Sequence, residues 1–228
     1  MTIKNNSLIK GTYFPPGDKS ISHRILILAS QAVGKSEISN LLEGEDVLNT
    51  LKAMRIFGAN ISKKNKKYVV FGVPPGGLFQ PNKPIDFGNS GTGIRLICGL
   101  IASNNIKAKL VGDGSLSKRP MKRVTVHLKK IGALINLKKD TYPPIKIQGD
   151  GEAVPLKYNI MIPSAQIKSA IMLSALNTKG LIEIKEFKTT RDHTENMLKA
   201  MGYNIKVCLL YTSPSPRDLS TSRMPSSA

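Results

Sequence analysis

The chain has 228 residues, of which 40% are hydrophobic, enough for one large or two small domains with a proper core. Tryptophan is absent and aromatic residues make up only 5%, so the core must be mainly aliphatic. No apolar stretch of about 18 residues occurs, which excludes a typical membrane-spanning helix. Met1–Lys10 lacks the apolar run of a secretory signal, so we expect a cytoplasmic protein. Cys98 and Cys208 suggest neither a disulfide framework nor a metal site.

The net charge of +19 raises the possibility of nucleic-acid binding. However, the lysines and arginines are spread along the whole chain, and the densest cluster, Lys63–Lys67, falls in a predicted hairpin turn. Aromatic residues that would stack on bases are not interleaved with them. An enzyme that acts on small polyanionic substrates also gains from a positive potential. We therefore expect no nucleic-acid partner.

The composition changes at Cys208. Residues 208–228 are rich in Ser, Pro and Thr without apolar periodicity, which is typical of a disordered tail. Back-translation of residues 208–218 and 222–228 also resembles the two ends of a sequencing-library adapter. We therefore expect this tail to be non-native and the natural sequence to be interrupted near Val207.

From Lys19 to Val207 one pattern runs three times: a helix, a strand, a second helix that ends at a glycine, and further strand. The first repeat predicts helices over 20–32 and 45–57, a strand over 36–41, and a hairpin of 59–62 with 68–73. The core-facing residues predicted for its two helices are Ile21, Ile25, Leu28 and Ala32, and Val47, Leu51 and Met54.

The second repeat predicts helices over 90–103 and 120–131, a strand over 107–111, and a hairpin of 134–138 with 145–148. The third predicts helices over 163–177 and 192–201, a strand over 181–185, and a hairpin that begins at 203–207. The helix-closing glycines Gly58, Gly132 and Gly202 lie about 70 residues apart, too far for a solenoid repeat. The pattern favours three βαβαββ-like modules of the α/β class.

The first helix of each module begins with small or polar residues: Lys19-Ser20, Asn89-Ser90-Gly91-Thr92, and Ser164-Ala165-Gln166. If the modules are related by pseudo-threefold symmetry, these N-termini point the same way and together attract anions. Ser20 and Arg24 are four residues apart and share a helix face. The alternative is that these residues are ordinary N-caps.

Other motifs have a structural and a functional interpretation. Gly88–Gly93 is a glycine-rich approach to a helix but lacks the dinucleotide spacing. Pro120 suits the first position of a helix, which leaves Arg119 free to fork onto a carboxylate or phosphate. Asp192 and Glu195 resemble a capping box. Lys168 is either a site residue or a solvated cation.

Three further features receive structural interpretations. Gly34-Lys35-Ser36 is not a P-loop, because the strand and helix around it occur in the reverse order. Asp46 is either a partner of Lys19 or an acid that favours a helix N-terminus. The three histidines are expected to be structural: His23, His127 and His193.

Five segments occur in the order found in the EPSP synthase (3-phosphoshikimate 1-carboxyvinyltransferase) family, which the chain resembles over residues 12–207: Pro16–Arg24, Gly88–Gly93, Gly112–Met121, Ile162–Ala170 and Thr190–Glu195. The resemblance implies an α/β enolpyruvyl transferase lobe of three βαβαββ-like modules, the third incomplete, with helices inside and sheets outside. Residues 1–14 would be a strand of a second lobe, 15–207 the N-terminal lobe, and 208–228 the tail.

The resemblance also implies transfer of enolpyruvyl from phosphoenolpyruvate to the 5-hydroxyl of shikimate-3-phosphate, with release of phosphate and without metal or cofactor. Lys19 would be catalytic. Shikimate-3-phosphate would contact Lys19, Ser20, Arg24, Ser164, Ala165, Gln166 and Arg191. Phosphoenolpyruvate would contact Lys19, Gly91, Arg119 and Gln166. The whole protein is expected to be a monomer.

In the family, the acid–base carboxylates and further arginines belong to the second lobe, so we expect these 228 residues to bind shikimate-3-phosphate weakly without turnover. One alternative is a UDP-N-acetylglucosamine enolpyruvyl transferase, against which Lys19, Ser20, Ser22 and Arg24 favour shikimate. A noncatalytic basic binding module is the other.

Overall fold

The computed structural model describes residues 11–207. The expectations for residues 1–10 and for the tail at 208–228 lie outside the described residues. Residues 11–14, the described part of the predicted first strand, are not in a strand. None of the described helices has the length and apolar character needed to cross a membrane.

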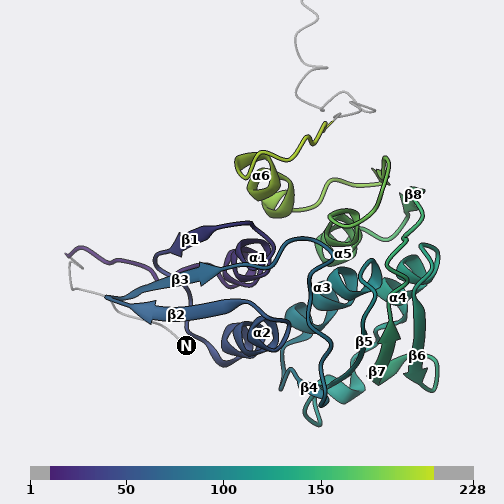
Figure 1. The fold of residues 1–228 in the computed structure, drawn as a ribbon, viewed down its shortest axis with the longest axis horizontal. Coiled ribbons are helices and arrows are strands. Elements are labelled where there is room, and N and C mark those ends of the chain that lie inside the picture. The colour runs from purple at the N-terminus through teal and green to yellow at the C-terminus, as the bar shows by residue number, and fades with distance from the viewer. Residues whose placement is uncertain (1–10, 208–228) are drawn as a thin grey trace, which may run out of the picture.

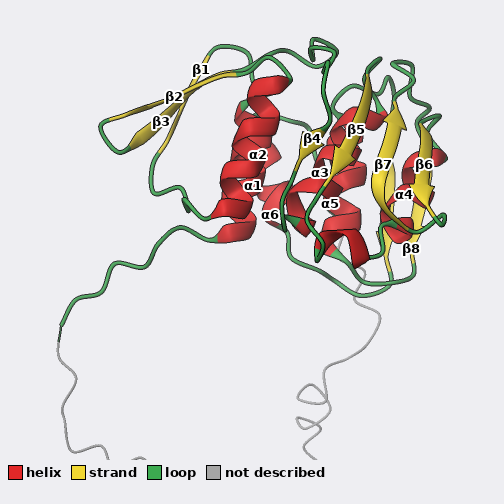
Figure 2. Ribbon diagram, turned by 90° about the horizontal axis from the view of Figure 1, so that it is seen from below, coloured by secondary structure: helices red, strands yellow, loops and turns green. Residues whose placement is uncertain are grey.

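The described residues form a mixed α/β fold with six α-helices and three small sheets (Figures 1 and 2). The helices are α1 Lys19–Ala29, α2 Glu45–Ile56, α3 Gly91–Ala102, α4 Lys122–Lys129, α5 Ala165–Ala175 and α6 His193–Ala200, with a short 3-10 helix at Leu116–Lys118. The strands are β1 Lys35–Ile38, β2 Asn60–Lys64, β3 Lys67–Phe71, β4 Ile85–Asp86, β5 Lys107–Val111, β6 Leu134–Lys138, β7 Tyr142–Gln148, β8 Lys157–Ile160 and β9 Glu183–Glu186.

The sheets repeat one arrangement. In the first, β3 pairs antiparallel with both β1 and β2, and in the second, β7 pairs antiparallel with both β5 and β6. β4 joins the second sheet parallel to β5, and β8 lies parallel to β9 in the third. The predicted hairpins β2–β3 and β6–β7 are therefore confirmed, whereas β4 and β8 were not predicted.

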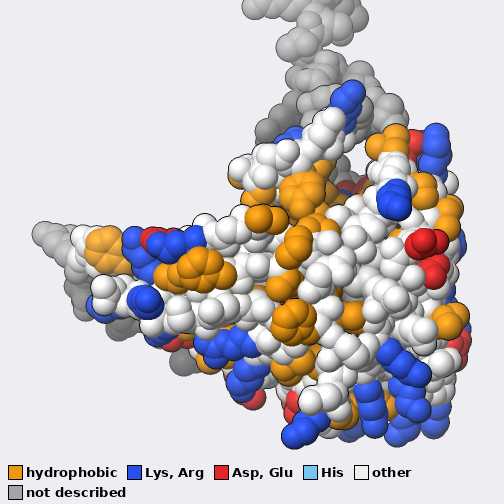
Figure 3. All heavy atoms as spheres, viewed as in Figure 1, with side chains coloured by type: hydrophobic (Ala, Val, Ile, Leu, Met, Phe, Trp, Pro, Cys, Tyr) orange, Lys and Arg blue, Asp and Glu red, His pale blue; other side chains and the backbone are white. Residues whose placement is uncertain are grey.

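Strand alternation decides which face of the second sheet meets the core. Ala108 and Leu110 are buried, while Lys107 and Lys109, which alternate with them along the strand, are exposed. Lys109 lies opposite Lys146 of β7, which is also exposed. The solvent face is accordingly rich in lysine, and Figure 3 shows Lys and Arg side chains gathered at that side of the molecule and on the β2–β3 hairpin.

Helices α1, α2, α3 and α5 lie side by side (Figure 2), and the contacts between them show that their N-termini share one end of the molecule. In the α1–α2 pair, Lys19 contacts Asp46 and, four residues later in both helices, His23 contacts Thr50. In the α3–α5 pair, the contacts advance from Thr92–Gln166 to Gly99, which lies against Ala170. Matching order in each pair means that the helices point the same way.

Helix α3 is the centre of the core. Eleven of its twelve residues are buried. It packs against α5 so closely that a Cβ at Gly99 would lie 2.1 Å from the carbonyl oxygen of Ala170. A helix buried on all sides satisfies its own backbone hydrogen bonds, so an apolar helix suits this position.

The three helix-closing glycines all adopt left-handed backbone conformations, as predicted. Gly58, Gly132 and Gly202 have φ of 102°, 108° and 87°. Glycine adopts positive φ without the steric penalty of a Cβ, so it ends each helix and turns the chain away.

Three sequence predictions are wrong. Helix α1 ends at Ala29 rather than at residue 32, and its core face differs from the predicted one. Ile21 is 39% exposed and Ile25 only partly buried, whereas Leu26 and Ile27 are fully buried. An apolar set at helical spacing does not identify the core face when most of the helix circumference is buried. Helix α4 begins at Lys122 rather than Pro120, and the amide of Met121 donates to the carbonyl of Thr141 outside the helix, at 2.7 Å. Residues 203–207 form no strand.

Candidate functional site

The N-terminus of α1 places Lys19 beside a carboxylate. Asp18 is the N-cap, and its side chain accepts from the amide of Ile21 at 2.8 Å. The Lys19 ammonium pairs with Asp46 in the first turn of α2. Asp46 therefore fits both sequence interpretations, because it lies at a helix N-terminus and also contacts Lys19.

Arg24 lies one turn further along α1 and ties three helices together. It is 3% exposed. Its guanidinium donates to the Ser20 carbonyl at 2.9 Å, to Ser169 Oγ of α5 at 2.8 Å and to Thr194 Oγ1 of α6 at 2.8 Å. Burial lowers the pKa of Arg24 from its ordinary value, with a smaller lowering from the neighbouring positive charge of Arg191.

Arg191 reaches the same place from the loop between β9 and α6. Its Nη1 donates to Ser20 Oγ at 3.4 Å, and the side chain is exposed. Two arginines and a hydroxyl thus meet at the N-terminus of α1. We name Lys19, Ser20, Arg24 and Arg191 the α1 cluster. Its three positive charges lie at a helix N-terminus, whose free amides also favour anions, so the cluster suits an anionic ligand.

A second group of polar residues forms at the N-terminus of α3. Ser90 caps this helix by accepting from the amide of Gly93 at 3.2 Å. A Cβ at Gly91 would lie 3.0 Å from Nη1 of Arg119 and 3.1 Å from Nη1 of Arg95. The absence of a side chain at Gly91 therefore lets two guanidinium groups approach the first turn. Arg119 is held by Asn89, to whose side-chain oxygen it donates.

Gln166 connects α3 with α5. Its amide nitrogen donates to Thr92 Oγ1 at 3.0 Å, and its amide oxygen accepts from Arg95 at 3.2 Å. Ser164 caps α5 by accepting from the amide of Ile167 at 3.4 Å, and Ala165 is the first residue of that helix. We name the six residues at this place the α3–α5 cluster: Gly91, Arg95, Arg119, Ser164, Ala165 and Gln166.

The structure thus brings the nine residues predicted for the site to the same end of the parallel helices, in two clusters joined through α5. Ser169 of that helix contacts Arg24, and Gln166 contacts Arg95. The three predicted helix N-termini also carry ordinary N-caps, at Asp18, Ser90 and Ser164. The capping interpretation and the shared-end arrangement are therefore both correct, since a side chain that caps one amide leaves other amides of the first turn free.

Arg95 is not among the residues that the sequence predicted for the site. It is buried and donates to the carbonyls of Gly91 at 2.9 Å and Pro120 at 3.1 Å as well as to Gln166. Burial lowers its pKa, and the nearby charges of Arg123 and Arg119 lower it further. The spacing of four residues from Gly91 was the one sequence signal that could have placed Arg95 in the site. The sequence instead favours an exposed Arg95, because a buried arginine is rare without a carboxylate partner.

Two interpretations of the third module are wrong. Lys168 is not a solvated cation: it is buried and pairs with Glu186 at 2.8 Å and Glu195 at 2.6 Å. Asp192 and Glu195 do not form a capping box, because Asp192 makes no side-chain cap and Glu195 is directed to Lys168. The carboxylate of Glu195 thus pairs with the buried ammonium of Lys168 instead of capping the start of α6.

The histidines do not contribute contacts to either cluster among the described residues. His23 is fully buried, its Nδ1 lies 2.8 Å from Thr50 Oγ1, and burial lowers its pKa to about 4. His127 packs edge-on against the ring of Tyr158, and burial lowers its pKa as well. Within residues 11–207 no three His, Cys, Asp or Glu side chains are grouped so that they could hold a metal ion.

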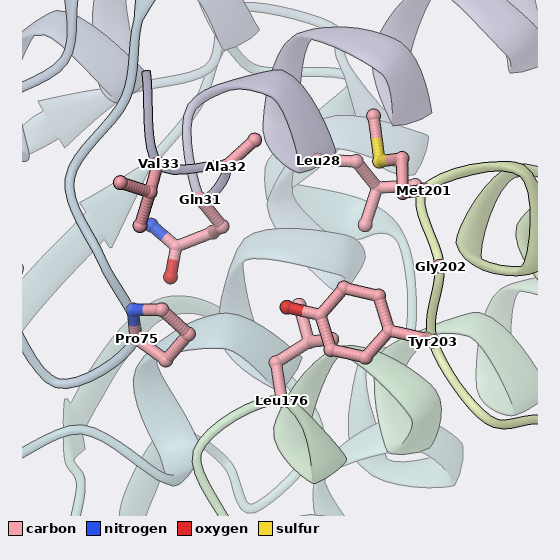
Figure 4. A pocket seen from close by; sticks show the side chains of 9 residues that line it. All are labelled: Leu28, Gln31, Ala32, Val33, Pro75, Leu176, Met201, Gly202 and Tyr203. Atoms are coloured by element: carbon pink, nitrogen blue, oxygen red, sulfur yellow. The ribbon is translucent and has the colours of Figure 1, made fainter.

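A cavity of about 350 Å³ lies at the opposite end of the helices, where α1, α5 and α6 finish (Figure 4). Leu28, Leu176 and Met201 line it, and Gln31 and Tyr203 extend polar groups toward it. Because it is at the C-terminal ends, the helix dipoles there favour cations rather than anions. This cavity is therefore separate from the two clusters.

Comparisons with known proteins point to a single family. The family model for EPSP synthase (3-phosphoshikimate 1-carboxyvinyltransferase) matches residues 3–221. The chain is 49% identical over 208 residues to the 3-phosphoshikimate 1-carboxyvinyltransferase of Ruegeria sp. (strain TM1040), covering 91% of this chain and 46% of that one. The corresponding protein of Parvibaculum lavamentivorans is 46% identical with the same coverage.

Among solved structures, EPSP synthase from Acinetobacter baumannii superposes with a TM-score of 0.82 at 40% identity, covering 86% of this chain and 45% of that one. The chain thus spans about half the length of the relatives that it matches. A family model that matches nearly the whole sequence and a shared fold at this identity lead to one conclusion: the chain belongs to the EPSP synthase family.

Proposed function

We propose that these residues form one lobe of an enzyme that transfers enolpyruvyl from phosphoenolpyruvate to the 5-hydroxyl of shikimate-3-phosphate and releases phosphate. In this proposal the lobe consists of three βαβαββ-like modules, the third incomplete, with the helices in the interior of the lobe and the sheets on its outside. The observation that carries the proposal is the α1 cluster, in which Arg24 and Arg191 meet Ser20 at a helix N-terminus. Such a site suits a phosphate or carboxylate.

The two clusters correspond to the two substrates, each of which carries a phosphate and a carboxylate. Shikimate-3-phosphate is proposed to bind between the α1 cluster and the N-terminus of α5, through Ser164, Ala165 and Gln166. Phosphoenolpyruvate is proposed to bind at Gly91 and Arg119. Gln166 lies between the sites, since it already contacts residues of α3 from its place on α5.

The reaction proceeds by protonation of the methylene carbon of phosphoenolpyruvate and addition of the substrate hydroxyl to the adjacent carbon. The tetrahedral intermediate then loses phosphate and a proton to restore the double bond. Lys19 is proposed to handle a proton in this sequence, and Asp46 supports the role because it contacts the ammonium and fixes its position. Arginines directed at the two anions hold the reacting groups together.

We predict that these 228 residues, tested alone, bind shikimate-3-phosphate weakly and do not turn over substrate. The carboxylates that lie beside the α1 cluster are engaged, since Asp18 caps α1 and Asp46 pairs with Lys19. The proposed acid–base carboxylates are those that the family carries on its second lobe.

Calorimetric titration with shikimate-3-phosphate tests the proposal. Arg191→Ala should weaken binding about 10-fold or more, because a charge-assisted hydrogen bond contributes about 1.5–3 kcal/mol. Lys185→Ala, which removes an exposed cation from the neighbouring strand β9, is the matched control and should have little effect.

Parallel titrations separate the alternatives. Binding of UDP-N-acetylglucosamine in place of shikimate-3-phosphate would identify the related enolpyruvyl transferase. Salt-sensitive binding of a DNA oligonucleotide, with no response to shikimate-3-phosphate, would identify a basic binding module.

A further inference from the structure

Lys168 is the most unusual cation in the third module. It is 6% exposed, and its ammonium lies between the carboxylates of Glu186 at the end of β9 and Glu195 in α6. Burial alone would lower its pKa, but the two hydrogen-bonded carboxylates outweigh burial and raise it. Lys168 is therefore a charged, fully engaged group and has no position from which to contact a ligand.

The same ammonium reaches the loop between β9 and α6. It donates to the Thr190 carbonyl at 3.5 Å, and Thr190 Oγ1 donates to the other oxygen of Glu186 at 2.5 Å. The next residue is Arg191, which contacts Ser20. Lys168 and Glu186 thus fix the backbone next to Arg191 through Thr190, while the Arg191 side chain remains exposed.

The contacts close a ring around three helices. Arg24 of α1 contacts Thr194, whose neighbour Glu195 pairs with Lys168 of α5. Lys168 contacts Thr190, and Arg191 returns to Ser20 of α1. The ring holds three cations, Arg24, Lys168 and Arg191, and two carboxylates, Glu186 and Glu195. Removing Lys168 leaves those two carboxylates without the ammonium that pairs with both of them.

We infer that Lys168 is a positioning residue that sets the place of Arg191 through Thr190 and Glu186, and that Lys168 itself does not touch the substrate. This inference rests on the proposed function, in which Arg191 binds the substrate anion. Without the ammonium, the carboxylates of Glu186 and Glu195 repel each other. The end of β9 and the start of α6 then separate, and the loop that bears Arg191 moves with them.

The test compares Lys168→Met and Glu186→Gln with the unaltered 228-residue chain. Lys168→Met leaves a buried and a partly buried carboxylate facing each other and risks unfolding. Glu186→Gln is therefore the second variant, because it keeps the side-chain shape and the Lys168–Glu195 pair. Lys157→Met is the matched control. It breaks the Lys157–Glu183 pair between β8 and β9, in which both side chains are exposed.

The first readout needs no ligand. Both variants should raise the rate of tryptic cleavage after Lys188 and Arg191 about 10-fold, because a loop that loses a buried anchor opens more often. Lys168→Arg should restore slow cleavage, and Lys157→Met should leave it unchanged. Cleavage at the unaltered rate in both Lys168→Met and Glu186→Gln overturns the inference.

The second readout is affinity for shikimate-3-phosphate with and without Arg191. Lys168→Met should weaken binding about 10-fold when Arg191 is present and less than about twofold in the Arg191→Ala background, because coupled residues are not additive. Equal losses in both backgrounds would mean that Lys168 acts independently of Arg191 and would refute the inference. If Arg191→Ala by itself does not weaken binding, the proposed function fails instead, and the cleavage rates still decide the role of Lys168.

Discussion

Gly99 allows α3 and α5 to approach more closely than any other residue would permit. An added Cβ would lie 2.1 Å from the Ala170 carbonyl oxygen and 2.7 Å from its carbonyl carbon. These are backbone atoms, so no side-chain rotation relieves the overlap. We predict that Gly99→Ala destabilises the fold and moves the two helices apart.

The magnitude follows from two opposing effects. Ordinary carbon contacts lie at about 3.5 Å or more, so the helices must separate by about 1 Å. Overpacking of a dense core costs about 1–3 kcal/mol, and a rigid backbone clash belongs at the upper end. Alanine returns about 1 kcal/mol through its higher helix propensity. The net loss is about 2 kcal/mol, or about 4–8 °C in the melting temperature of a domain this size.

Urea and thermal unfolding followed by circular dichroism measure this loss. Gly114→Ala is the control, because a Cβ there meets nothing within 4 Å. Its stability should change by less than about 0.5 kcal/mol. Gly99→Ala with unchanged or higher stability would refute the claim that α3 and α5 pack at this distance. The contacts of Gln166 with α3 should weaken together with stability.

Two further predictions concern buried titratable groups. The pKa of His23 is about 4 in the folded chain, against an ordinary 6.5. As the pH falls, the unfolded chain therefore binds a proton at His23 before the folded chain does. The free energy of unfolding should be highest above pH 6.5 and should fall by about 3 kcal/mol as the pH drops to about 4. Urea unfolding across this range measures the fall, and His23→Gln should flatten it; an equally steep fall in that variant would contradict the assignment. Burial raises the pKa of Cys98 to about 12, so iodoacetamide should label its tryptic peptide only after unfolding, and rapid labelling of the folded chain would show that the core around α3 opens.

Local features of the sequence were sufficient for most helix boundaries and for the hairpins. Glycine at a helix end and serine before a helix act within a few residues, so Gly58, Gly132 and Ser90 have the roles predicted for them. The motif around Pro120 predicted a helix start two residues too early, since α4 begins at Lys122. The amide of Met121 bonds to Thr141, twenty residues away, and such a partner cannot be identified from the residues around the helix start.

The candidate site shows the same division. Residue types and spacing in the sequence pointed to the polar helix N-termini and to the cations Lys19 and Arg119, and the family resemblance added Arg191. Only the tertiary structure decided that Arg191 meets Ser20 across the chain and that Gln166 joins α5 to α3. It alone assigned Lys168 to a buried ion pair rather than to solvent. The reason is physical: a helix start depends on neighbours in sequence, whereas the partner of a buried charge depends on which helices pack side by side.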